Sequence, residues 1–169
     1  QQKLFLQLII RKKQKNKEKM HDKEIKLFTN GLKFAQDEFF LDSIKEFQSL
    51  VNEYPDSELA DDALYNIGLC YFHVGQFENA IQTFFKVIQE YPDSTISILD
   101  GGNEFGKTAA KCHYSIMNCY LALGNVEKAK KHIEELSSFI DSYKVINNQK
   151  NSFHSIAKEA YNTYKNIKS

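Results

Sequence analysis

Val51-Asn52-Glu53-Tyr54-Pro55-Asp56-Ser57 recurs along the chain as Ile88-Gln89-Glu90-Tyr91-Pro92-Asp93-Ser94, at an offset of 37 residues. The same offset relates Gly31 to Gly68. Self-similarity at a period of this length is typical of proteins that stack copies of one structural unit. This stretch therefore indicates the architecture, because it sets both the length of the unit and the place where each unit ends.

A second offset places a third unit further along the chain. Tyr71 is related to Tyr120 and Gly75 to Gly124, at 49 residues. The longer offset predicts an insertion between the second and third units, at about residues 95–106. The repeats then span about residues 24–57, 61–94 and 110–141.

The hydrophobic periodicity inside the unit is helical. In the second unit Leu64, Ile67 and Tyr71 follow one another at spacings of three and four, which places them on one face of a helix. The pattern breaks at Gly75, and Pro92 ends the second helical stretch because proline cannot continue a helix. Each unit is thus predicted to be two antiparallel helices, and such pairs must stack to bury their apolar faces.

The stack needs a covering element at its C-terminal end. Residues 145–168 have apolar side chains at the 3.6-residue period and predict a capping helix. We expect residues 20–169 to form a single domain.

The residues of the second unit resemble the tetratricopeptide repeat family. That family's pattern is a bulky residue, Leu-Gly, Tyr, Gly, Ala, Phe and Pro. The second unit supplies Leu64, Ile67-Gly68, Tyr71, Gly75, Ala80, Phe84 and Pro92. The first and third units depart from it, with Asn30 for the leucine, Ser43 for the alanine, Met117 for the glycine and Asp141 for the proline. The Tyr-Pro-Asp-Ser ending is similar to the bacterial envelope subtype, which includes the Tol–Pal accessory protein and an outer-membrane assembly lipoprotein. The resemblance implies an all-α right-handed superhelix of three helix pairs plus the capping helix.

Charge is distributed unevenly along the 169 residues, although the net charge is zero. Residues 1–19 carry +6, residues 20–106 carry −11 and residues 107–169 carry +5. The acidic middle disfavours nucleic acid as a partner, and weak self-association of opposite charges is a further expectation. For residues 1–19 two interpretations stay open, a leader or inert tail before Met20 and a short interfacial anchor, which would be the chain's only contact with a membrane.

Gly101-Gly102-Asn103-Glu104-Phe105-Gly106-Lys107-Thr108 satisfies the spacing of a phosphate-binding loop. In that interpretation Lys107 reaches a phosphate and Thr108 binds magnesium. A phosphate-binding loop belongs in a parallel sheet, however, whereas helical repeats flank this stretch. We therefore expect a surface loop that lengthens one turn, with Thr108 as the N-cap of the next helix.

The remaining polar residues indicate no catalytic or metal site. The three cysteines contain no C-x-x-C pair, and the five histidines have no ligand spacing. The acidic run from Asp56 to Asp62 is expected to be a solvated helix start. We accordingly expect no enzyme activity, no cofactor and no metal.

The inner face of the stack is where we expect binding. Phe28, Tyr65 and Tyr114 form an aromatic column at equivalent positions of the three units, and we expect these rings to be exposed in a groove. The whole predicted binding set is Phe28, Leu32, Tyr65, Leu69, Phe72, Lys111, Tyr114 and Asn118.

Some members of the resembled family hold a carboxylate with a clamp of Lys, Asn and Arg residues. Asn66 and Lys111 match two of the clamp positions, but Phe28, Leu32 and Ser115 occupy the others. The resemblance therefore implies an apolar peptide or helix as the ligand, rather than a terminal carboxylate. The expected function is a cytoplasmic protein-binding adaptor, with a periplasmic or envelope-associated location and a self-assembling scaffold as alternatives.

Overall fold

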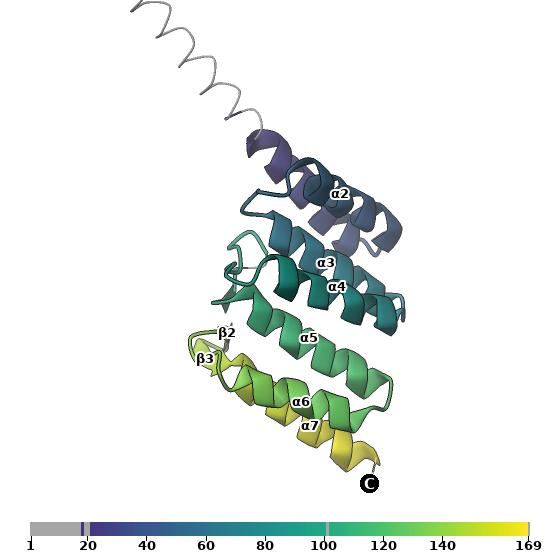
Figure 1. Ribbon diagram of the computed structural model, residues 1–169, viewed down its shortest axis with the longest axis vertical. Helices are drawn as coiled ribbons and strands as arrows, with labels where there is room; N and C mark the ends of the chain where they lie inside the picture. The colour runs from purple at the N-terminus through teal and green to yellow at the C-terminus, as the bar shows by residue number, and fades with distance from the viewer. Residues whose placement is uncertain (1–17, 19–20, 101, 169) are drawn as a thin grey trace, which may run out of the picture.

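The computed structural model describes residues 18, 21–100 and 102–168 (Figure 1). Antiparallel helix pairs follow one another along the long axis of the molecule, as the repeat predicts. Apart from Glu18, the basic stretch of residues 1–19 lies outside the described residues, and so do both interpretations of it. The pairs are a helix over residues 21–36 with α2 (Phe40–Glu53), α3 (Ala60–His73) with α4 (Phe77–Glu90), and α5 (Thr108–Ala122) with α6 (Val126–Leu136).

The last helix, α7 (Phe153–Lys168), packs against both α5 and α6. Its buried side chains, Phe153 and Ala157, belong to the core of the third pair. The expected superhelix of three pairs with a capping helix is therefore confirmed. None of the helices in the described ranges is both long and apolar enough to cross a membrane.

Close contact within the first two pairs depends on glycine. A Cβ atom added at Gly68 would lie 2.5 Å from a ring carbon of Phe84, and one added at Gly31 would lie 2.6 Å from a ring carbon of Phe47. Both phenylalanines are fully buried. The two glycines thus let each aromatic ring of the second helix rest directly on the backbone of the first, which explains why the repeat keeps them.

The capping helix begins at Phe153, so the expectation that it begins at about residue 145 was wrong. Residues 143–152 form a hairpin of β2 (Tyr143–Ile146) and β3 (Gln149–Ser152). Asn147 and Asn148 connect the strands with positive φ angles of 51° and 62°. Positive φ at both central residues is the geometry of the tight turn that suits twisted strands, and asparagine tolerates it.

The insertion is also more structured than the expected surface loop. Thr95 pairs with Lys107, and Ile96 is buried in the core of the third pair. Within it, β1 (Glu104–Phe105) pairs with β2, which makes a three-stranded antiparallel sheet. The insertion therefore packs against the domain and is tied to the C-terminal hairpin, on the same side of the stack (Figure 1).

Candidate peptide-binding groove

The first helix of each pair, together with α7, forms what we call the inner face. The eight predicted binding residues lie on the helix of residues 21–36, on α3 and on α5. Five of them are partly exposed, and these are Leu32, Leu69, Phe72, Tyr114 and Asn118.

The exposed aromatic column that the sequence suggested does not exist. Phe28 is 0% and Tyr65 4% exposed, while only Tyr114 keeps part of its ring accessible. Phe28 packs edge-on against Phe47, with 5.6 Å between ring centroids. Tyr65 lies 5.3 Å from the Phe84 ring, and its hydroxyl group is 2.9 Å from that of Ser115. These two rings are core residues because the helix pairs turn them toward the second helices and toward the neighbouring pair.

Lys111 is buried as well, at 3% exposure, beneath the insertion. Its ammonium nitrogen lies 2.5 Å from Asp100 Oδ2 and 2.7 Å from Glu104 Oε2. It also sits 4.3 Å from the centroid of the Tyr65 ring. Burial alone would lower the pKa of Lys111, but the surrounding Tyr65, Asp100 and Glu104 raise it above its ordinary value.

The carboxylate of Asp100 therefore contacts both residues that match a clamp, Asn66 and Lys111. Its Oδ1 accepts a hydrogen bond from Asn66 Nδ2 at 3.2 Å, while its Oδ2 contacts Lys111. Glu104 forms an ion pair with the same Lys111 and a second one with Lys144, at 3.3 Å. The insertion thus supplies an internal carboxylate, so this part of the inner face is closed.

The carboxyl groups at the start of α3 are buried, contrary to the expectation of a solvated helix start. Asp61 accepts a hydrogen bond from the Thr108 hydroxyl at 2.6 Å, and Asp62 accepts one from the Ser97 amide at 3.0 Å. Asp62 Oδ1 has no hydrogen-bond partner in the described part of the chain. Burial raises the pKa of Asp62 to about 8, and that of Asp61 is also raised. Of the acidic run, only Asp56 and Glu58 are exposed.

The stretch that satisfies the phosphate-binding pattern makes hydrogen bonds to other parts of the protein. The Thr108 hydroxyl is held by Asp61, and the Lys107 ammonium group donates to the carbonyl oxygen of Asp93 at 2.9 Å. Strand β1 lies inside the motif and pairs in an antiparallel manner. Lys107, not Thr108, is the N-cap of α5. The described residues of this stretch therefore lack the arrangement that phosphate binding needs.

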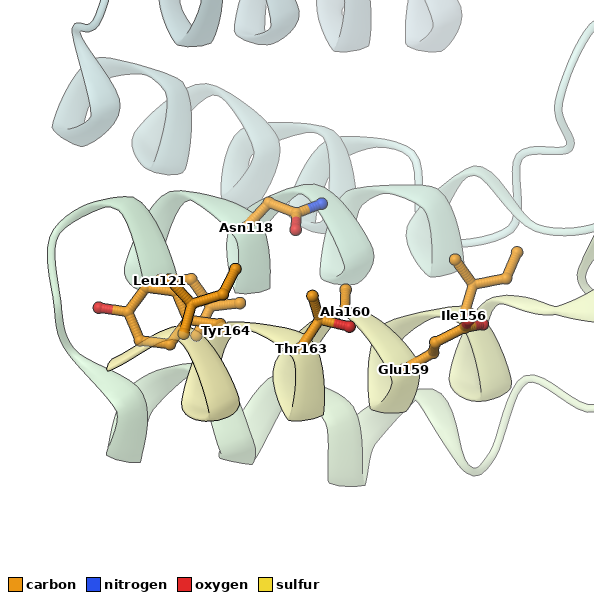
Figure 2. A pocket seen from close by; sticks show the side chains of 8 residues that line it. Asn118, Leu121, Ile156, Glu159, Ala160, Thr163 and Tyr164 are labelled. Carbon is orange, nitrogen blue, oxygen red and sulfur yellow. The ribbon is translucent and has the colours of Figure 1, made fainter. Parts of the chain in front are cut away.

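An open groove of about 500 Å³ remains on the inner face between α5 and α7. Figure 2 shows Asn118 and Leu121 of α5 facing side chains of α7 across it. Asn118 is the only predicted binding residue that lines this groove. The binding set predicted from the sequence does not include the α7 residues that line this groove. Their helical spacing predicts a helix that covers the third pair, which is why they were not expected to bind a ligand. These residues are Ile156, Glu159, Ala160, Thr163, Tyr164 and Ile167.

Two histidines, His113 of α5 and His132 of α6, are in contact, although their spacing in the sequence does not indicate it. His113 Nδ1 and His132 Nδ1 are 2.9 Å apart, so that one imidazole donates and the other accepts. His132 also stacks on Tyr120 at 5.7 Å between centroids. Burial lowers the pKa of His132 to about 4 and lowers that of His113. Among the described residues no group of three or more His, Cys, Asp or Glu side chains is placed to hold a metal.

The His113–His132 pair is expected to contribute stability that is lost in acid. Because the unfolded histidine has a pKa near 6.5 and folded His132 one of about 4, the unfolded state binds more protons between these values. The stabilisation is complete above about pH 6.5 and is lost as the pH falls toward 4. Relative to His132→Phe, the wild type should lose on the order of 1 kcal/mol between pH 7.5 and 5, allowing for solvent screening. Urea unfolding at the two pH values measures this. His154→Phe, outside the pair, is the control, and an identical pH dependence in wild type and His132→Phe would contradict the assignment.

Residues 61–94, which span α3 and α4, match the model of the tetratricopeptide repeat family. No curated protein matches the chain in sequence. Among solved structures, the TPR2AB domain of yeast Sti1 in its pHSP90 complex has a TM-score of 0.63 and 16% identity, over 86% of this chain. This chain spans about half (48%) of that Sti1 chain.

Two further structures are similar over most of their own length. The type III secretion chaperone SycD of Yersinia enterocolitica, in complex with a peptide of the translocator YopD, has a TM-score of 0.61 and 15% identity, over 88% of this chain and 96% of that one. The first TPR of Spaghetti (RPAP3), bound to the HSP90 peptide SRMEEVD, has a TM-score of 0.59 and 15% identity, over 86% and 93%. At such identities the likeness is one of fold. The second helix pair of this chain is therefore a tetratricopeptide repeat, and the chain has the tetratricopeptide-repeat fold.

Proposed function

We propose that this chain is a non-enzymatic adaptor that binds a peptide or helical segment of a partner protein on the open part of its inner face. The observation that carries the proposal is the groove between α5 and α7, which is apolar and uncovered. Leu69 and Phe72 on α3 are also partly exposed. Concave surfaces with large apolar side chains and few polar groups suit amphipathic segments.

The similar structures support a peptide ligand. Two of them hold peptides, from YopD in SycD and from HSP90 in Spaghetti. In this chain the two residues that match the clamp, Asn66 and Lys111, already contact the carboxylate of Asp100. The ligand that we propose is accordingly an apolar segment in the α5–α7 groove rather than a terminal carboxylate.

The proposal predicts which substitutions abolish binding. Ala160 is partly exposed and lines the groove, so Ala160→Lys would fill it with a long charged side chain. Peptides selected from a random library against the whole chain should carry apolar side chains at helical spacing. Their affinity should fall at least about tenfold in Ala160→Lys, which corresponds to about 1.4 kcal/mol.

The matched control is Asn162→Lys, an equal change of charge at an exposed position of the same helix that does not line the groove. It should leave the affinity within about twofold. Equal losses in both variants, or a library that yields no binder, would contradict binding in this groove.

Self-assembly is the second candidate, and the uneven charge is what favours it. Residues 20–106 are acidic and residues 107–169 basic, so stacking places opposite charges toward opposite ends of one axis. Opposite ends of this kind favour a head-to-tail contact between copies. Exposed ion pairs contribute less than about 1 kcal/mol each and are screened by salt. We therefore rank this proposal below groove binding.

A further inference from the structure

A second hollow, of about 1560 Å³, lies where the first two helix pairs meet the insertion. Its walls come from the start of the helix of residues 21–36, from residues 53–59 at the end of α2 and in the turn that follows it, and from residues 91–99. None of its lining residues also lines the α5–α7 groove. We call it the N-terminal cleft, and nothing in the proposed function makes use of it.

One wall of the N-terminal cleft is apolar and open to solvent. Ile98 is 76% and Leu99 41% exposed, both on the insertion. Ile25, Leu59 and Tyr91 also line the cleft. Adjacent large aliphatic side chains that stay exposed beside a hollow are typical of an interaction surface rather than of a solvated turn.

The other walls are strongly acidic. Glu53, Asp56 and Glu58 are exposed, and their side chains make no hydrogen bond or ion pair within the ranges that the structure describes. His21 is the only basic side chain among the described lining residues, and it lies 3.9 Å from Glu24. The carboxyl groups of the lining belong to Glu18, Glu24, Glu53, Asp56, Glu58, Asp61 and Asp93.

We propose that the N-terminal cleft docks a basic amphipathic segment of a partner protein. Lysine or arginine side chains of that segment would meet the exposed carboxylates of Glu53, Asp56 and Glu58, and its aliphatic side chains would cover Ile98 and Leu99. The charge complementarity selects the partner's sign and speeds its association, while burial of the apolar wall supplies affinity. Nucleic acids and acidic peptides are repelled by the same carboxylates.

The test uses the whole chain and a short fluorescein-labelled peptide composed only of leucine and lysine, in a helical pattern. Saturable binding is expected, followed by fluorescence anisotropy, and binding should weaken as salt is raised. The variant Glu53→Gln/Asp56→Asn/Glu58→Gln should bind this peptide about tenfold more weakly, since it removes three exposed charges. The same peptide with glutamate in place of each lysine should not bind.

A matched variant separates the cleft from general charge attraction. Glu127→Gln/Glu134→Gln/Asp141→Asn removes the same number of exposed carboxylates at positions that do not line the cleft. It should change the affinity by less than about twofold. An equal loss of affinity in the two triple variants would overturn the proposal, as would the absence of saturable binding.

The apolar wall has its own pair of variants. Ile98→Ser should weaken peptide binding several-fold, while Ile140→Ser, at a residue 79% exposed elsewhere, should not. Two results would reassign the cleft. Tighter binding of the peptide after neutralising Arg11, Lys12 and Lys13 would identify the chain's own basic stretch as the occupant. Self-association that the acidic-cleft variant abolishes would identify a second copy.

Discussion

Lys111→Ala is expected to lower the free energy of unfolding by about 3–5 kcal/mol, because it removes the cation from between two largely buried carboxylates. The side chains of Asp100 and Glu104 are 10% and 15% exposed, and the Lys111 side chain is 4% exposed. Without Lys111, Asp100 and Glu104 lose their shared cation, and Asp100 acts on buried Asp62, which already lacks a partner for one oxygen in the described part of the chain. Urea unfolding followed by circular dichroism measures the loss.

Lys144→Ala is the matched control, because Lys144 also pairs with Glu104 but is 38% exposed. It should cost less than about 1 kcal/mol. Replacing the whole group, with Lys111→Met/Asp100→Asn/Glu104→Gln, should recover most of the stability that Lys111→Ala loses, since none of the three replaced side chains then carries a charge that needs a partner. A cost for Lys111→Ala no larger than that for Lys144→Ala would mean that the insertion does not hold the charges as described.

Gly68→Leu is expected to destabilise the fold by about 3 kcal/mol, at the upper end of the range for overpacking. Even a methyl group at this position would lie within 2.5–2.9 Å of three ring carbons of Phe84. The Phe84 ring is fully buried and touches Tyr65, so it has no free space to move into. A substitution that gains helix propensity is therefore expected to lose stability.

Gln82→Leu, at an exposed position of α4, is the control and should stay within about 0.5 kcal/mol of the wild type. The double variant Gly68→Ala/Phe84→Leu tests the mechanism. The smaller leucine makes room for the methyl group, so the two changes together should cost less than the sum of the single changes. Additive costs would show that Gly68 matters for another reason than its contact with Phe84.

The helix pairs were predictable because they depend on periodic, local information. Gly31 and Gly68 mark the close contacts, and Pro55 and Pro92 follow the ends of α2 and α4. Helical spacing fixes which side chains share a face, so the order and number of the pairs follow from the sequence. Such a signal repeats in every unit and is therefore visible without any knowledge of the packing.

The burial of the polar cluster was not predictable in this way. Asp61, Asp62 and Lys111 have the composition of an exposed helix start, and their partners lie in the insertion or at the start of the next first helix. A contact between side chains more than ten residues apart leaves no periodic trace in the sequence. The prediction of an exposed aromatic column was wrong for the same reason. Helical spacing shows that Phe28 and Tyr65 occupy equivalent positions, but not that Phe47 and Phe84 pack against their rings.

The β2–β3 hairpin, in contrast, had a local signal. Asn147-Asn148 follows the β-branched and aliphatic pair Val145-Ile146, and asparagine favours the positive φ that a two-residue hairpin requires. The helical spacing of apolar residues from Phe153 onward does not by itself mark where the helix begins. The error lay in the boundary of the capping helix rather than in its existence.

The pairing of β1 with β2 changes the order in which the chain comes apart. In a simple stack each unit touches only its neighbours, so the end units fray one after another. Here backbone hydrogen bonds join residue 104, between the second and third pairs, to residue 144, beyond the third pair. Helix α7 follows directly on β3 and cannot detach without straining that ladder. Amide protons of α5, α6 and the hairpin should therefore exchange with deuterium as one cooperative unit. The helix of residues 21–36, for which the described residues show no such strand pairing, should open independently.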